Sequence, residues 1–305
     1  GFSALEKLVP TEDCTKTQLI AHALREFRLA GVALEDRERR RFAELAQELA
    51  QLQARFEQNL MDATDAFEHH ETASEALAGL PDMILDHGRR EAEAKGLTGW
   101  LLPLDPPTYV AVLTHAESEP LRKRYYEAWV TRASDQGPHA GQWDNNTLIE
   151  DIMRRRHEVA ELVGFANYAG LSLATKMAAT PEEVLGFLRV LASKSRSVAE
   201  TELAELTEFA GRRLNPWDLD FYGERLKQER FQLAEDELRP YFPLPRVLEG
   251  MFRVVKSLFG ISITARDGVD SWHPDVRYFE ISSEQGKILG GFFVDLFARP
   301  NKRGG

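Results

Sequence analysis

The sequence contains a single cysteine and no long apolar run. Cys14 cannot form a disulfide within the chain, which fits a reducing compartment, so we expect a cytoplasmic location. No run of 18 apolar residues and no signal peptide is visible, so we expect no membrane partner. Basic residues are outnumbered, because 38 Lys and Arg stand against 49 Asp and Glu, for a net charge of -11. That balance disfavours a phosphate-binding surface, so we expect no nucleic-acid partner.

The sequence also lacks an initiator methionine. It opens with GFSALEKL and stops at NKRGG, shortly after a strongly apolar run. We interpret these ends as cut points and expect the chain to be a fragment of a longer protein.

The stretch RRRHEVAELVGF, residues 154–165, falls one residue short of a metal-binding motif. In H-E-x-x-H helices two histidines one turn apart bind zinc, and the glutamate acts as general base. His157 and Glu158 are present, but Glu161 stands where the second histidine would be, and the other histidines supply no H-x-x-x-H spacing. We therefore expect an ordinary amphipathic helix, with Glu158 paired to Arg154 on its solvated side and no metal ligand.

Most of the chain follows helical periodicity. Residues 35–70 contain neither Gly nor Pro and carry apolar residues three and four positions apart, which predicts one very long amphipathic helix. The other expected helices span residues 15–30, 81–95, 106–115, 119–133, 145–163, 181–212, 217–232 and 245–259. The expected fold class is therefore mainly α, with one helical region over residues 1–259.

The character of the sequence changes near Gly260. Residues 261–265, 276–281 and 287–297 are short, β-branched and aromatic, and a five-residue turn containing Gly separates the last two. These patterns predict a small antiparallel sheet within residues 260–305, which we expect to be the only substantial sheet of the chain.

Two adjacent glycines in the last expected strand point to a binding surface. They remove side-chain bulk, so another backbone could approach, as happens when an extended peptide adds to a sheet edge. The peptide-binding candidates are Gly290, Gly291, Phe292, Phe293 and Asp295. An equally good alternative is a β-bulge in a plain hydrophobic sheet. Because the apolar run here calls for cover on both faces, we expect the isolated chain to self-associate through it.

Two polar stretches allow either a functional or a structural interpretation. TRASDQGPHAGQWDNN, residues 131–146, has the length of a functional loop, but we slightly favour Asp144 or Asn145 capping the next helix while Trp143 covers its end. WHPDVRYFEI, residues 272–281, places His273 near Asp275. Without a nucleophile or a metal that pair has nothing to activate, so we favour a strand entry with surface charges.

Several long strings carry a resemblance to a known family. They are SLATKMA (172–178), NPWDLDFYGERLKQERF (215–231), LRPYFPL (238–244), WHPDVRYFE (272–280) and GGFFVDLFARPNKRGG (290–305). In order along the chain, they resemble the thimet oligopeptidase family of zinc metallopeptidases, and TRASDQGPHAGQWDN (131–145) resembles its oligopeptidase A branch.

The resemblance implies a two-lobed, mainly helical zincin-type fold with a channel for short peptides and a small sheet on its wall. It also implies zinc, held by an H-E-x-x-H helix and a later glutamate that would both lie beyond Gly305. No catalytic or metal residue is therefore carried over, and zinc is expected only in the full-length parent. By resemblance the chain is an inactive part of a metalloendopeptidase that hydrolyses short peptides. The alternative is a helical scaffold or peptide-binding module.

Overall fold

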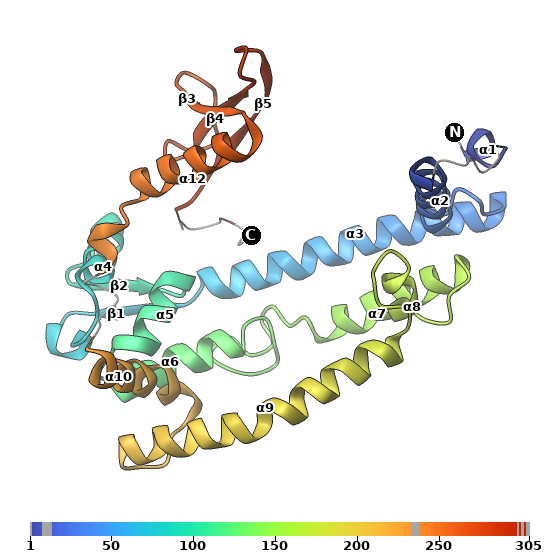
Figure 1. Cartoon of the computed structure of the whole chain (residues 1–305). Coiled ribbons are helices and arrows are strands. Elements are labelled where there is room, and N and C mark those ends of the chain that lie inside the picture. Colours follow the sequence, from blue (N-terminus) through green and yellow to red (C-terminus); the bar gives the residue numbers. More distant parts are fainter. Residues whose placement is uncertain (1, 8–13, 233–237, 298, 300–301, 303–305) are drawn as a thin grey trace. The chain divides into compact units, whose positions relative to one another are not determined.

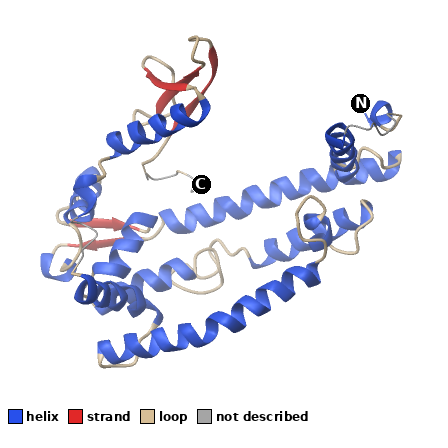
Figure 2. Cartoon of the chain, viewed as in Figure 1, coloured by secondary structure: helices blue, strands red, loops and turns tan. Residues whose placement is uncertain are grey.

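The computed structural model describes residues 2–7, 14–232, 238–297, 299 and 302. Helices dominate these residues, which confirms the mainly α fold class (Figure 2). The chain divides into two compact units, unit 1 (Gly1–Glu68 and Tyr126–Glu208) and unit 2 (His69–Tyr125 and Phe209–Gly305). The boundary expected at residues 259/260 lies inside unit 2 and separates helices from sheet, so that division stays a prediction.

Unit 1 is built around a pair of packed helices, which belong to different segments of the chain. Its elements are α1 (Phe2–Leu5), α2 (Cys14–Leu29), α3 (Asp36–Asp65), the end of α6 (Glu119–Val130), α7 (Asn146–Leu162), α8 (Tyr168–Leu173) and most of α9 (Pro181–Ala210). Helices α3 and α7 lie side by side (Figure 1). Leu45 of α3 and Ala160 of α7 are completely buried, as the helical spacing of their apolar neighbours requires.

Ion pairs join the two helices along the edge of this contact. Arg41 of α3 donates two hydrogen bonds to Glu158 of α7, with N to O distances of 2.6 and 2.9 Å. Glu48 of α3 accepts hydrogen bonds from Arg41, at 3.2 Å, and from Arg155 of α7. The expected pairing of Glu158 with Arg154 is therefore wrong. A two-pronged guanidinium from the neighbouring helix holds this carboxylate, which is a stronger arrangement than a single pair within one helix.

The first part of unit 2 combines a short sheet with helices. Its elements are most of β1 (Glu68–Glu71), η1 (Ser74–Leu77), α4 (Asp82–Ala94), β2 (Trp100–Pro103), α5 (Pro106–His115), the start of α6, η2 (Pro216–Asp218) and α10 (Leu219–Phe231). Strands β1 and β2 pair with each other. The helix expected over residues 35–70 therefore ends at Asp65, because the residues after it pair with a distant strand. This sheet was not expected.

The last part of unit 2 begins with η3 (Arg239–Tyr241) and α12 (Leu244–Phe259), which ends at Gly260 with φ 65°. That left-handed conformation favours glycine and closes the helix. Strands β3 (Ser262–Arg266), β4 (Arg277–Ser282) and β5 (Ile288–Val294) form an antiparallel sheet in the order β3-β4-β5 (Figure 1). The sheet predicted at the end of the chain is thereby confirmed.

Helix α12 packs on one face of this sheet. The ring of Phe252 contacts the buried ring of Phe279 on β4, with 5.1 Å between their centroids. Phe279 in turn stacks on Phe292 of β5 at 5.6 Å. These three aromatic rings form the centre of the layer between helix and sheet.

No helix among the described residues is both long enough and apolar enough to cross a membrane.

Candidate functional site

The candidate peptide-binding residues lie on and just after strand β5. In the described part of the chain this strand pairs with β4 alone, so its other side is a sheet edge. Phe292 points toward α12 and belongs to the core described above. Phe293 lies on the opposite face, 40% exposed, between the rings of Tyr278 and Trp272 at centroid distances of 4.8 and 5.1 Å. Of the two rings, Phe293 therefore presents the larger apolar surface.

The two glycines of β5 differ in what surrounds them. A Cβ added to Gly291 would overlap the hydroxyl oxygen of Tyr278, which crosses over from the neighbouring strand, and would lie 3.0 Å from the carbonyl oxygen of Phe279. Gly291 is therefore needed by the sheet itself. A Cβ at Gly290 would meet open space. The strand register also skips Leu289, between the pairs Ile281 with Gly290 and Ser282 with Ile288, so a bulge is present beside the glycines.

Asp295, the last candidate, is the centre of an ion-pair cluster. Its carboxylate accepts two hydrogen bonds from Arg299, at 2.7 and 2.8 Å, and one from the indole nitrogen of Trp272 at 3.0 Å. Lys302 lies 3.1 Å away and also donates to the carbonyl oxygens of Asp295 and Phe297. Hydrogen bonding from Arg299 holds the pKa of Asp295 far below its ordinary value, against the opposing effect of burial. The carboxylate of Asp295 is therefore already bound by side chains of its own chain.

The two histidine pairs considered from the sequence both lie on the surface. In α7, His157 lies 3.5 Å from Glu161, with both side chains more than half exposed. His273 lies 3.6 Å from Asp275, and its Nδ1 accepts the backbone N–H of that residue. Among the residues that the structure describes, no three His, Cys, Asp or Glu side chains come together in a way that could hold a metal ion.

The loop over residues 131–146 is held by its own side chains. Asp144 accepts the N–H of Asn146 at 2.9 Å, so it caps the start of α7 as we favoured. Asn145 is buried and points elsewhere, accepting from Asn59 of α3 at 2.8 Å and donating to the carbonyl of Phe56 at 3.1 Å. The loop is thereby anchored to α3, a role that the sequence analysis did not assign to Asn145.

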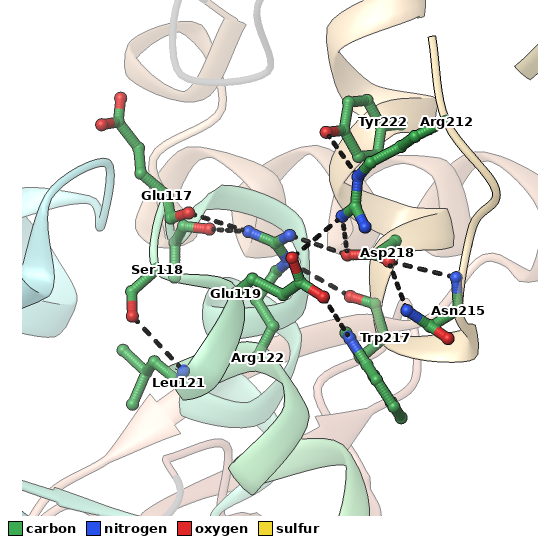
Figure 3. Close-up of polar contacts among 11 residues, drawn as sticks. Glu117, Ser118, Glu119, Leu121, Arg122, Arg212, Asn215, Trp217, Asp218 and Tyr222 are labelled. Carbon is green, nitrogen blue, oxygen red and sulfur yellow. Dashed lines mark hydrogen bonds and ion pairs between the residues drawn. The ribbon is translucent and has the colours of Figure 1, made fainter. Parts of the chain in front are cut away.

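A buried ion pair in unit 2 was missed by the sequence analysis. Arg122 of α6, 2% exposed, donates to Asp218, which is completely buried at the start of α10, over 2.8 Å (Figure 3). The guanidinium also donates to the carbonyl oxygens of Ala116, Glu117 and Trp217 at 2.7, 3.1 and 3.3 Å. Four of the five N–H donors of this guanidinium therefore have an acceptor, as a buried charge requires.

Asp218 gathers further donors from its own segment. Arg212 lies 2.9 Å from the same carboxylate oxygen, and the backbone N–H of Asn215 donates to the other at 3.1 Å (Figure 3). Arg212 also pairs with Glu119 at 3.2 Å. Burial alone would raise the pKa of Asp218, but the hydrogen bond from Arg122 and the charges around it lower the pKa overall. The buried pair of Arg122 and Asp218 fixes the start of α10 against α6, and Arg212 and Glu119 at its edge stay partly exposed.

The sequence contained a local signal for one half of this cluster. Asn215 and Asp218 bracket Pro216 and Trp217 in a capping box, a recognisable helix start. Nothing in the sequence identified Arg122 as the partner, because Arg122 lies in a charged run that reads as a solvated helix face.

Comparison with known proteins places the chain in a family. Residues 112–305 match peptidase family M3. Oligopeptidase A of Escherichia coli (strain K12) is 44% identical over 300 residues, which cover 97% of this chain and 44% of that protein. A probable cytosolic oligopeptidase A of Arabidopsis thaliana is 37% identical over 303 residues, covering 94% of this chain and 42% of that protein. Dipeptidyl carboxypeptidase of Escherichia coli (strain K12) is 33% identical over 300 residues, with coverages of 96% and 44%.

These matches confirm the resemblance to the oligopeptidases and to their oligopeptidase A branch. The chain spans less than half the length of each of these relatives. By sequence, this chain belongs to peptidase family M3.

Proposed function

We propose that the chain is a non-catalytic part of a cytoplasmic peptidase that hydrolyses short peptides. The observation that carries the proposal is the match of nearly the whole chain to oligopeptidase A, of which it spans only 44%. A relative named as probably cytosolic supports the location. The competing function is that of a helical scaffold or peptide-binding module without hydrolytic activity.

The zinc ion implied by the family resemblance does not fit the residues described here. A catalytic zinc site needs three protein ligands, and the described side chains provide no such group. His157 has only Glu161 beside it, and both are exposed. We therefore assign no catalytic step to this chain. In a complete peptidase, the residues that hold zinc would lie outside this sequence, and the ion would supply an activated water.

Strand β5 is the element that we propose contacts the substrate. Its unpaired edge offers backbone donors and acceptors, which is how an extended peptide binds to a sheet. Open space at Gly290 and the exposed ring of Phe293 add room and an apolar contact. Gly291, Phe292 and Asp295 then support the edge indirectly, because each is already engaged within the sheet or the ion-pair cluster.

The proposal for hydrolysis is tested with a short fluorogenic peptide. We expect no hydrolysis by the 305-residue chain, and chelator-sensitive hydrolysis by the product of the complete reading frame. Metal analysis after dialysis should find no stoichiometric zinc on the chain. Activity of the chain that disappears on His273→Ala, or zinc lost on His157→Ala, would contradict the proposal. A complete product that binds peptides without hydrolysing them would favour the scaffold.

The proposal for β5 is tested in the complete, active protein. A competitor peptide with alternate backbone amides N-methylated should inhibit far more weakly than its unmethylated form. Each methyl group replaces an N–H that would donate a hydrogen bond to a carbonyl oxygen of the sheet edge. Phe293→Ala should raise KM more than it lowers kcat. Equal inhibition by both peptides, together with an unchanged KM, would remove β5 from the binding site.

A further inference from the structure

Helix α12 has one broad apolar face, and the sheet covers only one side of it. On the covered side Phe252 contacts Phe279, and Leu248 and Val255 are partly buried on the same face. On the other side five apolar side chains are exposed by 38 to 70%, and we call them the seam: Leu244, Val247, Met251, Val254 and Leu258.

The spacing of the seam is that of a helix partner. Its residues follow each other at intervals of three, four, three and four, the a and d positions of a heptad repeat. These exposed a and d positions are the ones that a single facing helix contacts, whereas the sheet covers the adjacent side with Leu248, Phe252 and Val255. Gly250 lies beside the seam, and a Cβ there would meet nothing within 4 Å. A second helix can therefore approach α12 closely at this point.

The charges along the seam specify the partner further. Arg246 and Arg253 occupy the c positions of the heptad, on the side where the seam is bordered only by Gly250 and Ser257. Both arginines are exposed, and no ion pair to either lies within the described part of the chain. Long arginine side chains can reach past such small residues. They would meet a helix whose flanking residues are acidic.

The length of the seam identifies where that helix comes from. Helix α12 has 16 residues and is about 24 Å long, so it offers two heptads. A sequence indicates an independent coiled coil when its heptads are sustained over at least about three to four repeats. Two heptads suffice when the partner belongs to the same polypeptide, because the tether supplies a high effective concentration. The relatives carry more than half of their length outside the matched region.

We propose that the seam of α12 packs against an acidic amphipathic helix in the part of the polypeptide that the longer relatives carry in addition to this region. The inference rests on the proposed relation to a longer peptidase, but its test measures accessibility and does not depend on hydrolysis.

The test compares one seam position with one solvated position on the same helix. Cys14 is replaced by Ser, and Met251→Cys or Lys256→Cys is introduced, because Lys256 occupies the outward f position. In the dilute 305-residue chain both cysteines should react with a maleimide at similar rates. In the product of the complete reading frame the cysteine at position 251 should react at least about tenfold more slowly, as expected for a site that must open locally to react. The cysteine at position 256 should be unaffected.

A charge reversal tests the chemistry of the partner. In the complete protein Arg253→Glu should restore fast labelling at position 251, whereas Lys256→Glu, the same charge change away from the seam, should not. Equal effects of the two charge reversals would contradict the proposal that the partner helix is acidic. Equal labelling of positions 251 and 256 in the complete protein, or a reading frame that ends at residue 305, would overturn the proposal. So would slow labelling of position 251 in the 305-residue chain at every concentration, because the cover would then lie within this chain.

Discussion

Replacing Asp218 by Asn is the sharpest perturbation that unit 2 offers. The substitution keeps the shape of the side chain and removes its charge, so Arg122 stays 2% exposed without a counter-ion. Removing one partner of a buried pair costs about 3–5 kcal/mol. Arg122 keeps three carbonyl acceptors at 2.7 to 3.3 Å, which places the expected loss near the lower limit, at about 3 kcal/mol.

The assay is urea denaturation followed by circular dichroism, with hydrogen exchange to locate the loss. Because Asp218 lies at the start of α10, amides of α10 should lose protection in the variant while those of α7 should not. The matched control is Asp86→Asn on α4, where the 3.0 Å pair with Arg89 has both side chains more than half exposed. That variant should lose no more than about 1 kcal/mol.

Two outcomes would refute the reasoning. The first is a loss for Asp218→Asn that equals the loss for Asp86→Asn. The second concerns the double variant Arg122→Met with Asp218→Leu, which removes both charges and should be more stable than Asp218→Asn alone. If the double variant is the less stable of the two, an uncompensated charge is not the cause.

Acid should act on the same pair. The pKa of Asp218 is lowered in the folded state from its ordinary 3.8, so its contribution to stability is complete above about pH 5 and is lost as the pH falls through the lowered pKa. Asp218→Asn should therefore flatten the dependence of unfolding free energy on pH in this acid range. An unchanged acid slope would show that Asp218 is protonated alike in both states.

Three further predictions concern other parts of the chain. Hydrogen bonding to Asp105 raises the pKa of His87 in the folded state above its ordinary 6.5, against the effect of burial. The contribution of His87 to folding stability is therefore complete below pH 6.5 and is lost as the pH rises through the higher folded pKa. An NMR titration that gives a pKa of 6.5 or less would contradict this. Gly291→Ala should cost about 1–3 kcal/mol in thermal or urea unfolding because it displaces Tyr278, whereas Gly290→Ala should change stability by less than about 1 kcal/mol. The isolated chain should self-associate through its exposed apolar surface around β5, so the average mass in sedimentation should rise with concentration, and a strictly monomeric chain would refute this.

Patterns that repeat within one element were predictable from the sequence. The apolar spacing around Leu45 predicted α3, and Gly260 marked the end of α12. The β-branched and aromatic residues after Gly260 predicted the three-stranded sheet. Each of these signals depends on residues a few positions apart, because helices and hairpins are stabilised by near neighbours.

Features that depend on distant partners were not predictable. Strand β1, with the sequence EHHE, has no apolar alternation and is a strand only because it pairs with β2. Glu158 bonds to a residue 117 positions away instead of its neighbour Arg154. In the candidate site the sequence drew attention to the glycine pair, but Tyr278, which makes Gly291 necessary, lies on the adjacent strand. A single sequence therefore does not indicate which distant residues come into contact in the fold.

The pair of Arg122 and Asp218 has a consequence for the folding of the chain during translation. The two residues are 96 positions apart, and the segment Tyr126–Glu208 of unit 1 is synthesised between them. At a synthesis rate of about 5–20 residues per second, about 5–20 s pass between the addition of Arg122 and the addition of Asp218. During this interval the first segment of unit 2 carries a cation that cannot be buried, so it cannot complete its core. Translation therefore sets an order of assembly in which unit 1 has the chance to fold first, and unit 2 closes only when Asp218 has emerged.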